Sequence, residues 1–487
     1  MSLTARLVSQ FKAEFVSRIV AMLTSGLLMV LLARLFGPDE YGLLFLAISV
    51  FTTIGIFAKL GIAKSGARYV AEYKETEPGQ LPHILRTSIR LNLAAIGIVT
   101  VVVVVAHRDI ALFLDEPGLQ PYLLLGVFYL LFEALSTYVR LMLQGLEKIQ
   151  VAATLHALNR TCRLVFALGF VVLGFGALGA LVGYILSFAI TMSVGLGVLY
   201  LQIYRPHADS SVIADGLRRR IGVYSVPLTA TSTANVLDKE VDTILVGYFV
   251  NPIAVSYYVV SKQIIQFVET PVTALGFTLS PTFGSQKADG NVEQAARIYE
   301  TALTNSLLLY IPVAAGLILV AEPTLVLFFG ESYMGAVPVL QVLGLYAILQ
   351  SVNRITSNGL DFLGRARARA VAKGITAALN VGLNVVLIPL IGVVGAALAT
   401  VITYSLYTFA NVYIVHQEFD LRLGYIARQV SRTVAVTGVM ALIVFVAVDF
   451  IDGFLSLALV VLLGVVVWGV LSTLTGLLDA KQIIALR

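Results

Sequence analysis

Long apolar runs separated by short polar segments form the main pattern of the chain. Each run is about 17 to 27 residues long, and as a helix rising about 1.5 Å per residue it matches the roughly 30 Å hydrocarbon core of a bilayer. Barrel strands would be nearer ten residues long and would alternate in polarity. The pattern therefore predicts an all-α integral membrane protein with fourteen transmembrane helices. They are predicted at residues 15–36, 43–62, 87–106, 121–143, 151–173, 177–203, 222–250, 253–279, 297–320, 337–359, 371–391, 395–415, 433–448 and 455–478.

Composition supports this interpretation. Hydrophobic residues make up 58% of the 487 residues and charged residues only 13%, which leaves too little polar surface to cover a water-soluble globule. We expect a multi-pass protein of the cell (cytoplasmic) membrane. With one cysteine and no metal-ligand or catalytic motif, we expect a transporter rather than an enzyme, with no resident metal or cofactor.

The basic residues between the runs are unevenly distributed. When the segments are assigned alternately to the two sides of the membrane, 23 Lys and Arg fall on the side of the N-terminus and only Arg108 falls on the other. Because cytoplasmic loops carry the excess of basic residues, both termini are predicted to be cytoplasmic. The net charge of +5 follows mostly from these loop residues, so it gives no reason to expect a nucleic-acid partner.

An internal repeat relates the first six predicted helices to the next six. Three pairs of short segments match at offsets of 214, 216 and 216 residues: Leu35–Pro38 with Phe249–Pro252, Phe113–Glu116 with Phe329–Ser332, and Gly176–Ala180 with Gly392–Ala396. Since six is even, both copies begin in the cytoplasm and run in parallel, and transporters of this kind bind substrate between two lobes. We predict a first lobe at residues 1–205, an inter-lobe linker at 206–220, a second lobe at 221–416 and two C-terminal helices within 417–487.

Several short segments, in their order along the chain, resemble one family of membrane transporters. They are Ser17-Arg18, Ala33-Arg-Leu-Phe-Gly37, Ala71-Glu-Tyr-Lys74, and Asp242-Thr-Ile-Leu-Val-Gly247 followed by Asn251-Pro252, Tyr257 and Lys262. The order is similar to that of polysaccharide-lipid flippases of the Wzx type, in the multidrug/oligosaccharidyl-lipid/polysaccharide exporter superfamily. Six plus six plus two helices is also this branch's layout, so the resemblance covers the whole chain.

The resemblance implies a flippase with two lobes around a central cationic cavity. Such a protein carries a polyprenyl (di)phosphate-linked oligosaccharide from the cytoplasmic to the outer leaflet by alternating access, for polysaccharide, O-antigen or glycoprotein biosynthesis. The expected partners are this lipid-linked glycan, the bilayer and glycan polymerase or ligase machinery, and the protein is expected to act as a monomer. Since no GxxxxGK[ST] motif is present, the energy source would be an ion gradient or removal of substrate on the far side.

Apart from these 23 and Arg108, nine basic residues remain, all inside the predicted helices, where a charge facing lipid costs about 2.5 to 3.5 kcal/mol. The central ones are Arg160, Arg163 and Lys262, which are too deep to reach the interface easily and are our main candidates for binding a phosphate. Arg18 lies one turn into the first helix, and the resemblance places its counterpart in the cavity. Near helix ends, where long side chains can reach the interface, lie the further candidates Arg34, Lys59 and Arg354, together with Arg140. The ninth residue is Lys239.

Acidic residues crowd one turn of the seventh predicted helix, at Asp238, Glu240 and Asp242. Lys239 lies among them and, at the i, i+3 spacing, can pair with Asp242, so one interpretation is a self-neutralised structural cluster. The other is a carboxylate that exchanges with Na⁺ or H⁺ and thereby drives the return of the transporter.

Two other functions fit the same architecture. A cation-coupled multidrug exporter would need an acidic, aromatic cavity for organic cations, whereas here the first helix carries arginines. A non-transport membrane protein, such as an assembly partner of a polymerase, would not need alternating access. The intramembrane bases outnumber the intramembrane acids, which favours an anionic ligand and hence the flippase.

Overall fold

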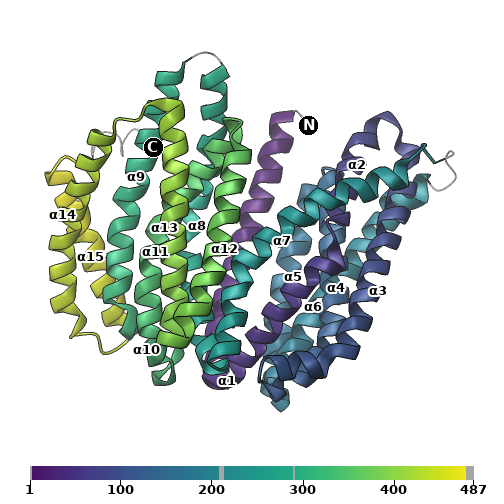
Figure 1. Ribbon diagram of the computed structural model, residues 1–487, viewed down its shortest axis with the longest axis horizontal. Coiled ribbons are helices and arrows are strands. Elements are labelled where there is room, and N and C mark those ends of the chain that lie inside the picture. Colours follow the sequence, from purple (N-terminus) through teal and green to yellow (C-terminus); the bar gives the residue numbers. More distant parts are fainter. Residues whose placement is uncertain (1–2, 208–212, 289–290, 479–487) are drawn as a thin grey trace. The chain divides into compact units, whose positions relative to one another are not determined.

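The computed structural model describes residues 3–207, 213–288 and 291–478, and within them every regular element is helical. By their internal contacts the residues divide into two compact units, Met1–Ser256 and Tyr257–Arg487. Part of the predicted linker, at residues 208–212, lies outside the described residues. So do Lys481 and Arg487, the last two of the basic residues predicted to be cytoplasmic. Figure 1 shows the helices in chain order.

The first unit contains the first seven helices and the start of the eighth. They are α1 (Leu3–Lys59), α2 (Ile62–Thr76), α3 (Leu81–Phe113), α4 (Gln120–Gly145), α5 (Ile149–Phe170), α6 (Gly176–Leu199), α7 (Leu217–Phe249) and the beginning of α8 (Pro252–Ala288). α7 packs on α1, α2 and α3. The first helix of the predicted second lobe therefore belongs, by its contacts, to the first compact unit, and the lobe boundaries stay a prediction from the repeat.

The second unit contains the rest of α8 and seven further helices. They are α9 (Val292–Leu319), α10 (Ala321–Phe329), α11 (Val337–Phe362), α12 (Ala366–Ile391), α13 (Val393–Phe419), α14 (Leu423–Val448) and α15 (Phe454–Leu474). α11 and α12 pack on α13, and α14 packs on both α9 and α15. The last two helices, at the yellow end of the colour scale in Figure 1, lie side by side.

Each predicted apolar run coincides with a long helix, with the first two runs joined in α1. Gly37 interrupts α1 at φ 70° and ψ −179°, a conformation that a residue without Cβ adopts easily, and Pro38 follows it. Ten segments of the described residues are long and apolar enough to span a membrane. Two of these ten segments, in α1 and in α5–α6, each contain two predicted helices, and α7 and α8 are not among the ten. The count of fourteen transmembrane helices stays a prediction.

Close backbone contact holds α5 against α6. A Cβ added at Gly183 would lie 2.4 Å from the backbone nitrogen of Ala167, so glycine is required where the two helices approach. Small residues serve the same purpose at membrane helix interfaces in general, because lipid tails give apolar side chains no reason to leave them. This packing directs the face of α5 that carries Arg160 and Arg163 toward α4 and α6.

Candidate functional site

A polar cavity of about 250 Å³ lies within the first unit, lined by α4, α5 and α6. Arg140 and Glu133 of α4 and His156, Arg160 and Arg163 of α5 are in its wall. Arg160 is eleven residues into α5, about 16 Å along the helix at about 1.5 Å per residue. The cavity is therefore near the middle of the helices that surround it.

Aromatic rings of α6 fix the position of Arg163. Its guanidinium lies 4.6 Å from the ring centre of Tyr184 and 4.8 Å from that of Phe188. It also donates a hydrogen bond of 3.3 Å from Nη2 to the Asn159 side chain oxygen. Cation–π contacts of this kind contribute about 0.5 to 2 kcal/mol, so Arg163 has a structural reason to adopt this conformation.

The side chain of Arg160, by contrast, has no hydrogen bond or ion pair with any residue that the structure describes. Its Nε is buried without a partner, as is the Nε of Arg163. A buried donor left without a partner costs about 1 to 3 kcal/mol, and the i, i+3 spacing also places two positive charges side by side. Two buried Nε donors without partners in one cavity wall are suited to an anion.

Glu133 does not supply that anion, because its carboxylate is already engaged by a third cation. Lys59 of α1 contacts both oxygens, at 2.9 and 2.8 Å, and Thr137 donates a further hydrogen bond at 3.1 Å. Lys59 therefore joins α1 to α4 beside the cavity. It neutralises the one acid in the cavity wall, so the charge of the arginines remains uncompensated.

A double-mutant cycle tests this ion pair. We expect Lys59→Ala and Glu133→Ala to show a coupling of about 1 to 2 kcal/mol in the free energy of unfolding, because both side chains are partly buried, with 29% and 19% of their surface exposed. The measurement is thermal unfolding of the purified protein in one detergent. The matched control is the exposed hydrogen bond from Lys64 to Ser232, of 3.2 Å, for which we expect a coupling below about 0.5 kcal/mol. Additive effects of the two α1–α4 substitutions would contradict the pairing.

The N-terminal arm of α1, the part of the helix before Gly37, contacts the N-terminal half of α5. Ser17 Oγ donates to the Ala153 carbonyl at 2.8 Å and lies 3.3 Å from Nδ1 of His156, which is also in the cavity wall. Arg18 and Arg34 on the same arm are exposed and are not part of the cavity lining. The structure thus brings Arg160 and Arg163 together in the cavity wall, and Lys59 contacts Glu133 of the same wall. Arg18 and Arg34 lie outside the cavity.

Two candidate cations lie in the second unit. The Lys262 ammonium is 5.4 Å from the Tyr258 ring centre, and Arg354 Nη2 is 3.6 Å from the buried carboxylate of Glu269. The contact of Arg354 with Glu269 of α8 is consistent with a structural role for this arginine, which lies near a helix end. Both residues stay candidates for substrate binding.

The acidic cluster of α7 lies in the first unit. Asp242 is buried with 3% of its surface exposed, and Glu240 accepts a hydrogen bond of 2.8 Å from Ser49 of α1. Asp238 is half-buried. The hydrogen bond to Ser49 gives α7 a polar contact with α1, while the predicted pair of Lys239 with Asp242 stays a prediction.

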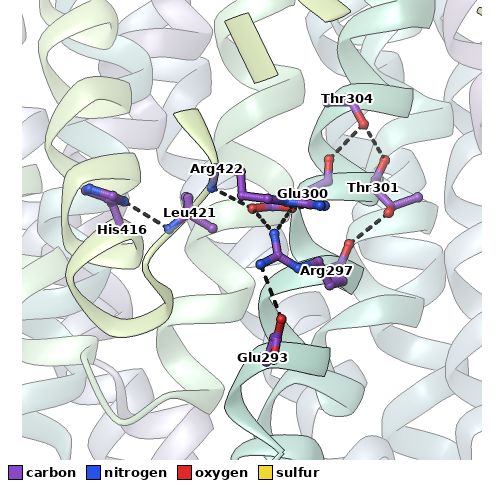
Figure 2. Close-up of polar contacts among 8 residues, drawn as sticks. All are labelled: Glu293, Arg297, Glu300, Thr301, Thr304, His416, Leu421 and Arg422. Carbon is purple, nitrogen blue, oxygen red and sulfur yellow. Dashed lines mark hydrogen bonds and ion pairs between the residues drawn. The ribbon is translucent and has the colours of Figure 1, made fainter. Parts of the chain in front are cut away.

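One buried acid escaped the sequence analysis. Glu300 of α9 has no exposed side-chain surface, accepts hydrogen bonds from Arg297 at 2.7 and 2.8 Å, and is held by Arg422 of the α13–α14 connection through its backbone N–H, Nε and Nη2 at 2.7 to 2.9 Å. Figure 2 shows both arginines converging on this carboxylate. The contact raises the pKa of Arg422 above its ordinary value. The only signal of this cluster in the sequence is the i, i+3 spacing of Arg297 and Glu300. Nothing in the sequence indicates Arg422, which is 122 residues away from Glu300.

Comparisons with known proteins agree with this architecture. The family model described as polysaccharide biosynthesis protein matches residues 10–286, and the MatE model matches residues 227–386. The probable low-salt glycan biosynthesis flippase Agl15 of Haloferax volcanii is 23% identical over 81% of this chain and 80% of its own. The lipopolysaccharide biosynthesis protein WzxC of Escherichia coli is 26% identical over 83% of this chain and 78% of its own.

Solved structures share the fold. The lipid II flippase MurJ in an inward closed conformation aligns with a TM-score of 0.74 at 16% identity, covering 96% of this chain and 98% of that one. An inward-facing multidrug resistance MATE family transporter aligns with a TM-score of 0.68 at 16% identity, covering 83% of this chain and 94% of that one. At such identities the alignments establish the fold alone.

Proposed function

Because this chain belongs to the polysaccharide biosynthesis protein family, within the multidrug/oligosaccharidyl-lipid/polysaccharide exporter superfamily, we propose that it is a flippase for lipid-linked glycans. It moves a polyprenyl (di)phosphate-linked oligosaccharide from the cytoplasmic to the outer leaflet by alternating access. Relatives that cover four fifths of the chain are named as proteins of glycan and lipopolysaccharide biosynthesis. The protein is a transporter in this proposal, with no chemical step of its own.

The observation that carries the proposal is the uncompensated positive charge of the α4–α6 cavity. Arg160 and Arg163 present buried Nε atoms without partners, and the acid in the wall is held by Lys59. A guanidinium grips carboxylate or phosphate oxygens in bidentate fashion, so the cavity suits the anionic part of a glycan substrate. An exporter of organic cations would require the opposite charge.

The finer topology is part of the proposal. We propose fourteen spans with both termini in the cytoplasm, arranged as two parallel repeats and two C-terminal helices. Supporting the repeat, the turn before α6 and the turn before α13 have nearly the same backbone conformation, with φ 56° and ψ −152° at Gly176 and φ 64° and ψ −150° at Gly392. These glycines are 216 residues apart, the offset found in the sequence.

The remaining roles extend the same proposal. Arg18, Lys262, Arg34 and Arg354 are further candidates for contact with the anionic substrate along its path. Of the three α7 acids, the buried Asp242 is our choice for the carboxylate that exchanges with Na⁺ or H⁺, because burial strengthens the interaction with a bound cation. The protein acts as a monomer and delivers its product to glycan polymerase or ligase machinery.

Loss of the gene tests the function directly. We expect a lipid-linked oligosaccharide to accumulate in the cytoplasmic leaflet, because synthesis continues while transfer across the bilayer stops. The measurement compares labelling of the glycan by a membrane-impermeant reagent in right-side-out and inside-out vesicles. The wild-type gene and an Arg432→Gln variant, altered at an exposed position of α14, should both restore labelling from outside. Unchanged labelling from outside after gene loss would contradict the proposal.

A further inference from the structure

An open groove of about 800 Å³ lies within the second unit, between α12 and α13. Its wall begins at Arg365 and Arg367, at the start of α12, and continues along this helix to Leu379. Leu406 and Ala410 of α13 form the other side. The groove is therefore basic at one end and apolar along most of its length.

The apolar part of the groove has the depth of one membrane leaflet. Val371, Ile375 and Leu379 line it at a spacing of four residues, which places them on one face of α12. Their side chains are 56%, 64% and 39% exposed. Eight residues separate the first from the last, a length of about 12 Å at about 1.5 Å per residue. Since one leaflet provides about 15 Å of hydrocarbon, the stripe matches an acyl chain that lies in a single leaflet.

The basic end of the groove has one arginine that no acid neutralises. Arg365 forms an ion pair with Glu418 at the end of α13, and Arg369 Nη2 lies 3.0 Å from Asp361. The side chain of Arg367 makes no hydrogen bond or ion pair with any residue that the structure describes. A guanidinium in this state can bind phosphate oxygens in bidentate fashion. The groove thus offers a place for one phosphate beside its apolar stripe.

The charge of the groove is confined to this end. The nearby Lys373 turns to α13, where its ammonium lies 4.2 and 4.9 Å from the ring centres of Tyr404 and Tyr407, and it is not part of the groove wall. Beyond Arg367, none of the described residues that line the groove is charged. A fitting ligand is therefore anionic at one end and apolar along the rest, which a soluble anion is not.

We propose that the α12–α13 groove binds an anionic phospholipid of the membrane, with its phosphate at Arg367 and one acyl chain along the apolar stripe. The proposed topology places the start of α12 on the cytoplasmic side, where anionic lipids give the leaflet a negative surface and basic pockets between helices bind their headgroups. A lipid in this position bridges α12 and α13 and stabilises the second unit. The site lies in a different unit from the α4–α6 cavity, and it does not depend on the proposed flippase function.

The experiment compares two phospholipids that differ only in the headgroup. The full-length protein, purified in a neutral detergent and freed of lipid, is titrated with dioleoyl phosphatidylglycerol, which is anionic, or with dioleoyl phosphatidylcholine, which is zwitterionic. The dissociation constant of each comes from the fraction of lipid-bound protein in native mass spectrometry. We expect phosphatidylglycerol to bind about tenfold more tightly, the amount that one hydrogen bond to a charged group supplies. It should also raise the unfolding temperature.

Three variants locate the bound lipid. Arg367→Gln should weaken binding of phosphatidylglycerol about tenfold and leave phosphatidylcholine unchanged, because only the charge contact is lost. Ala372→Phe should weaken binding of both lipids, since Ala372 lines the groove and the larger ring takes the place of the acyl chain. The control is Arg428→Gln, at an exposed position in the second turn of α14, which should change neither dissociation constant. Because Arg367 is itself exposed, its variant is expected to fold even if Ala372→Phe does not.

Two competitors test the other sources of a phosphate. We expect neither undecaprenyl phosphate nor glycerol 3-phosphate to displace phosphatidylglycerol at equal concentration. Displacement by undecaprenyl phosphate that depends on Arg367 would assign the groove to a glycan carrier, and displacement by glycerol 3-phosphate would reduce it to a site for small anions. Either result would overturn the proposal. So would equal affinities of the wild type for the two phospholipids, or equal effects of Arg367→Gln and Arg428→Gln.

Discussion

Replacing Arg160 by alanine is expected to lower transport of the native substrate by about 100-fold without lowering the stability of the protein. Hydrogen bonds to charged groups contribute about 1.5 to 3 kcal/mol each. Loss of a bidentate pair at the lower end of this range removes about 3 kcal/mol, which at about 1.4 kcal/mol per tenfold gives this magnitude. Stability should hold, or rise, because the substitution removes a buried donor that has no partner among the described residues. The measurements are the initial transport rate in vesicles and the unfolding temperature of the purified protein.

Arg163→Ala is the matched comparison. Its transport should fall to a similar degree, but its unfolding temperature should fall as well, because Arg163 packs on the rings of Tyr184 and Phe188 and bonds to Asn159. The two variants together separate binding from structure. A fall in unfolding temperature on loss of Arg160, with transport preserved, would mean that this arginine has a structural role.

The positions of the helices could be predicted from the sequence, because each apolar run must cover the bilayer core by itself. The break between the first two runs and the turns before α6 and α13 were also visible, as Gly-Pro or glycine clusters, and the structure places positive φ angles at Gly37, Gly176 and Gly392. These features depend on neighbouring residues alone. Packing between helices that are distant in the sequence depends on more than neighbouring residues. The contacts of α7 with α1, α2 and α3 were therefore not apparent from the sequence.

The candidate site was predicted in part. Depth along a helix identified Arg160 and Arg163, and the structure places both in one cavity wall. The residues around them come from other helices: Lys59 and Glu133 are separated by 74 residues, and no periodicity relates them. The sequence alone therefore does not tell which intramembrane cation has an acidic partner. In the structure Lys59 and Arg354 each lie beside an acid, whereas the side chain of Arg160 has no partner among the described residues.

Substitution of Glu300 by alanine is expected to lower the free energy of unfolding by about 2 to 3 kcal/mol. The change removes the acceptor of two arginines and of a backbone N–H that holds the α13–α14 connection against α9 (Figure 2). Breaking a fully buried pair costs about 3 to 5 kcal/mol when the remaining charge stays buried. Here the side chains of Arg297 and Arg422 are 35% and 51% exposed, so water can solvate them and the expected loss is smaller.

Glu293 provides the matched control for this prediction, since it contacts the same Arg297 from one turn earlier in α9. Its carboxylate is 3.7 Å from Arg297 Nη2 and its side chain is 86% exposed, and exposed pairs of this kind contribute at most about 1 kcal/mol. Glu293→Ala should therefore change the free energy of unfolding by less than about 0.5 kcal/mol under the same detergent conditions. Equal effects of the two substitutions would show that general surface charge stabilises this end of α9, and that the converging contacts on Glu300 do not. A large effect of Glu300→Ala alone, reproduced by Arg422→Ala, would show that this carboxylate holds the α13–α14 connection against α9.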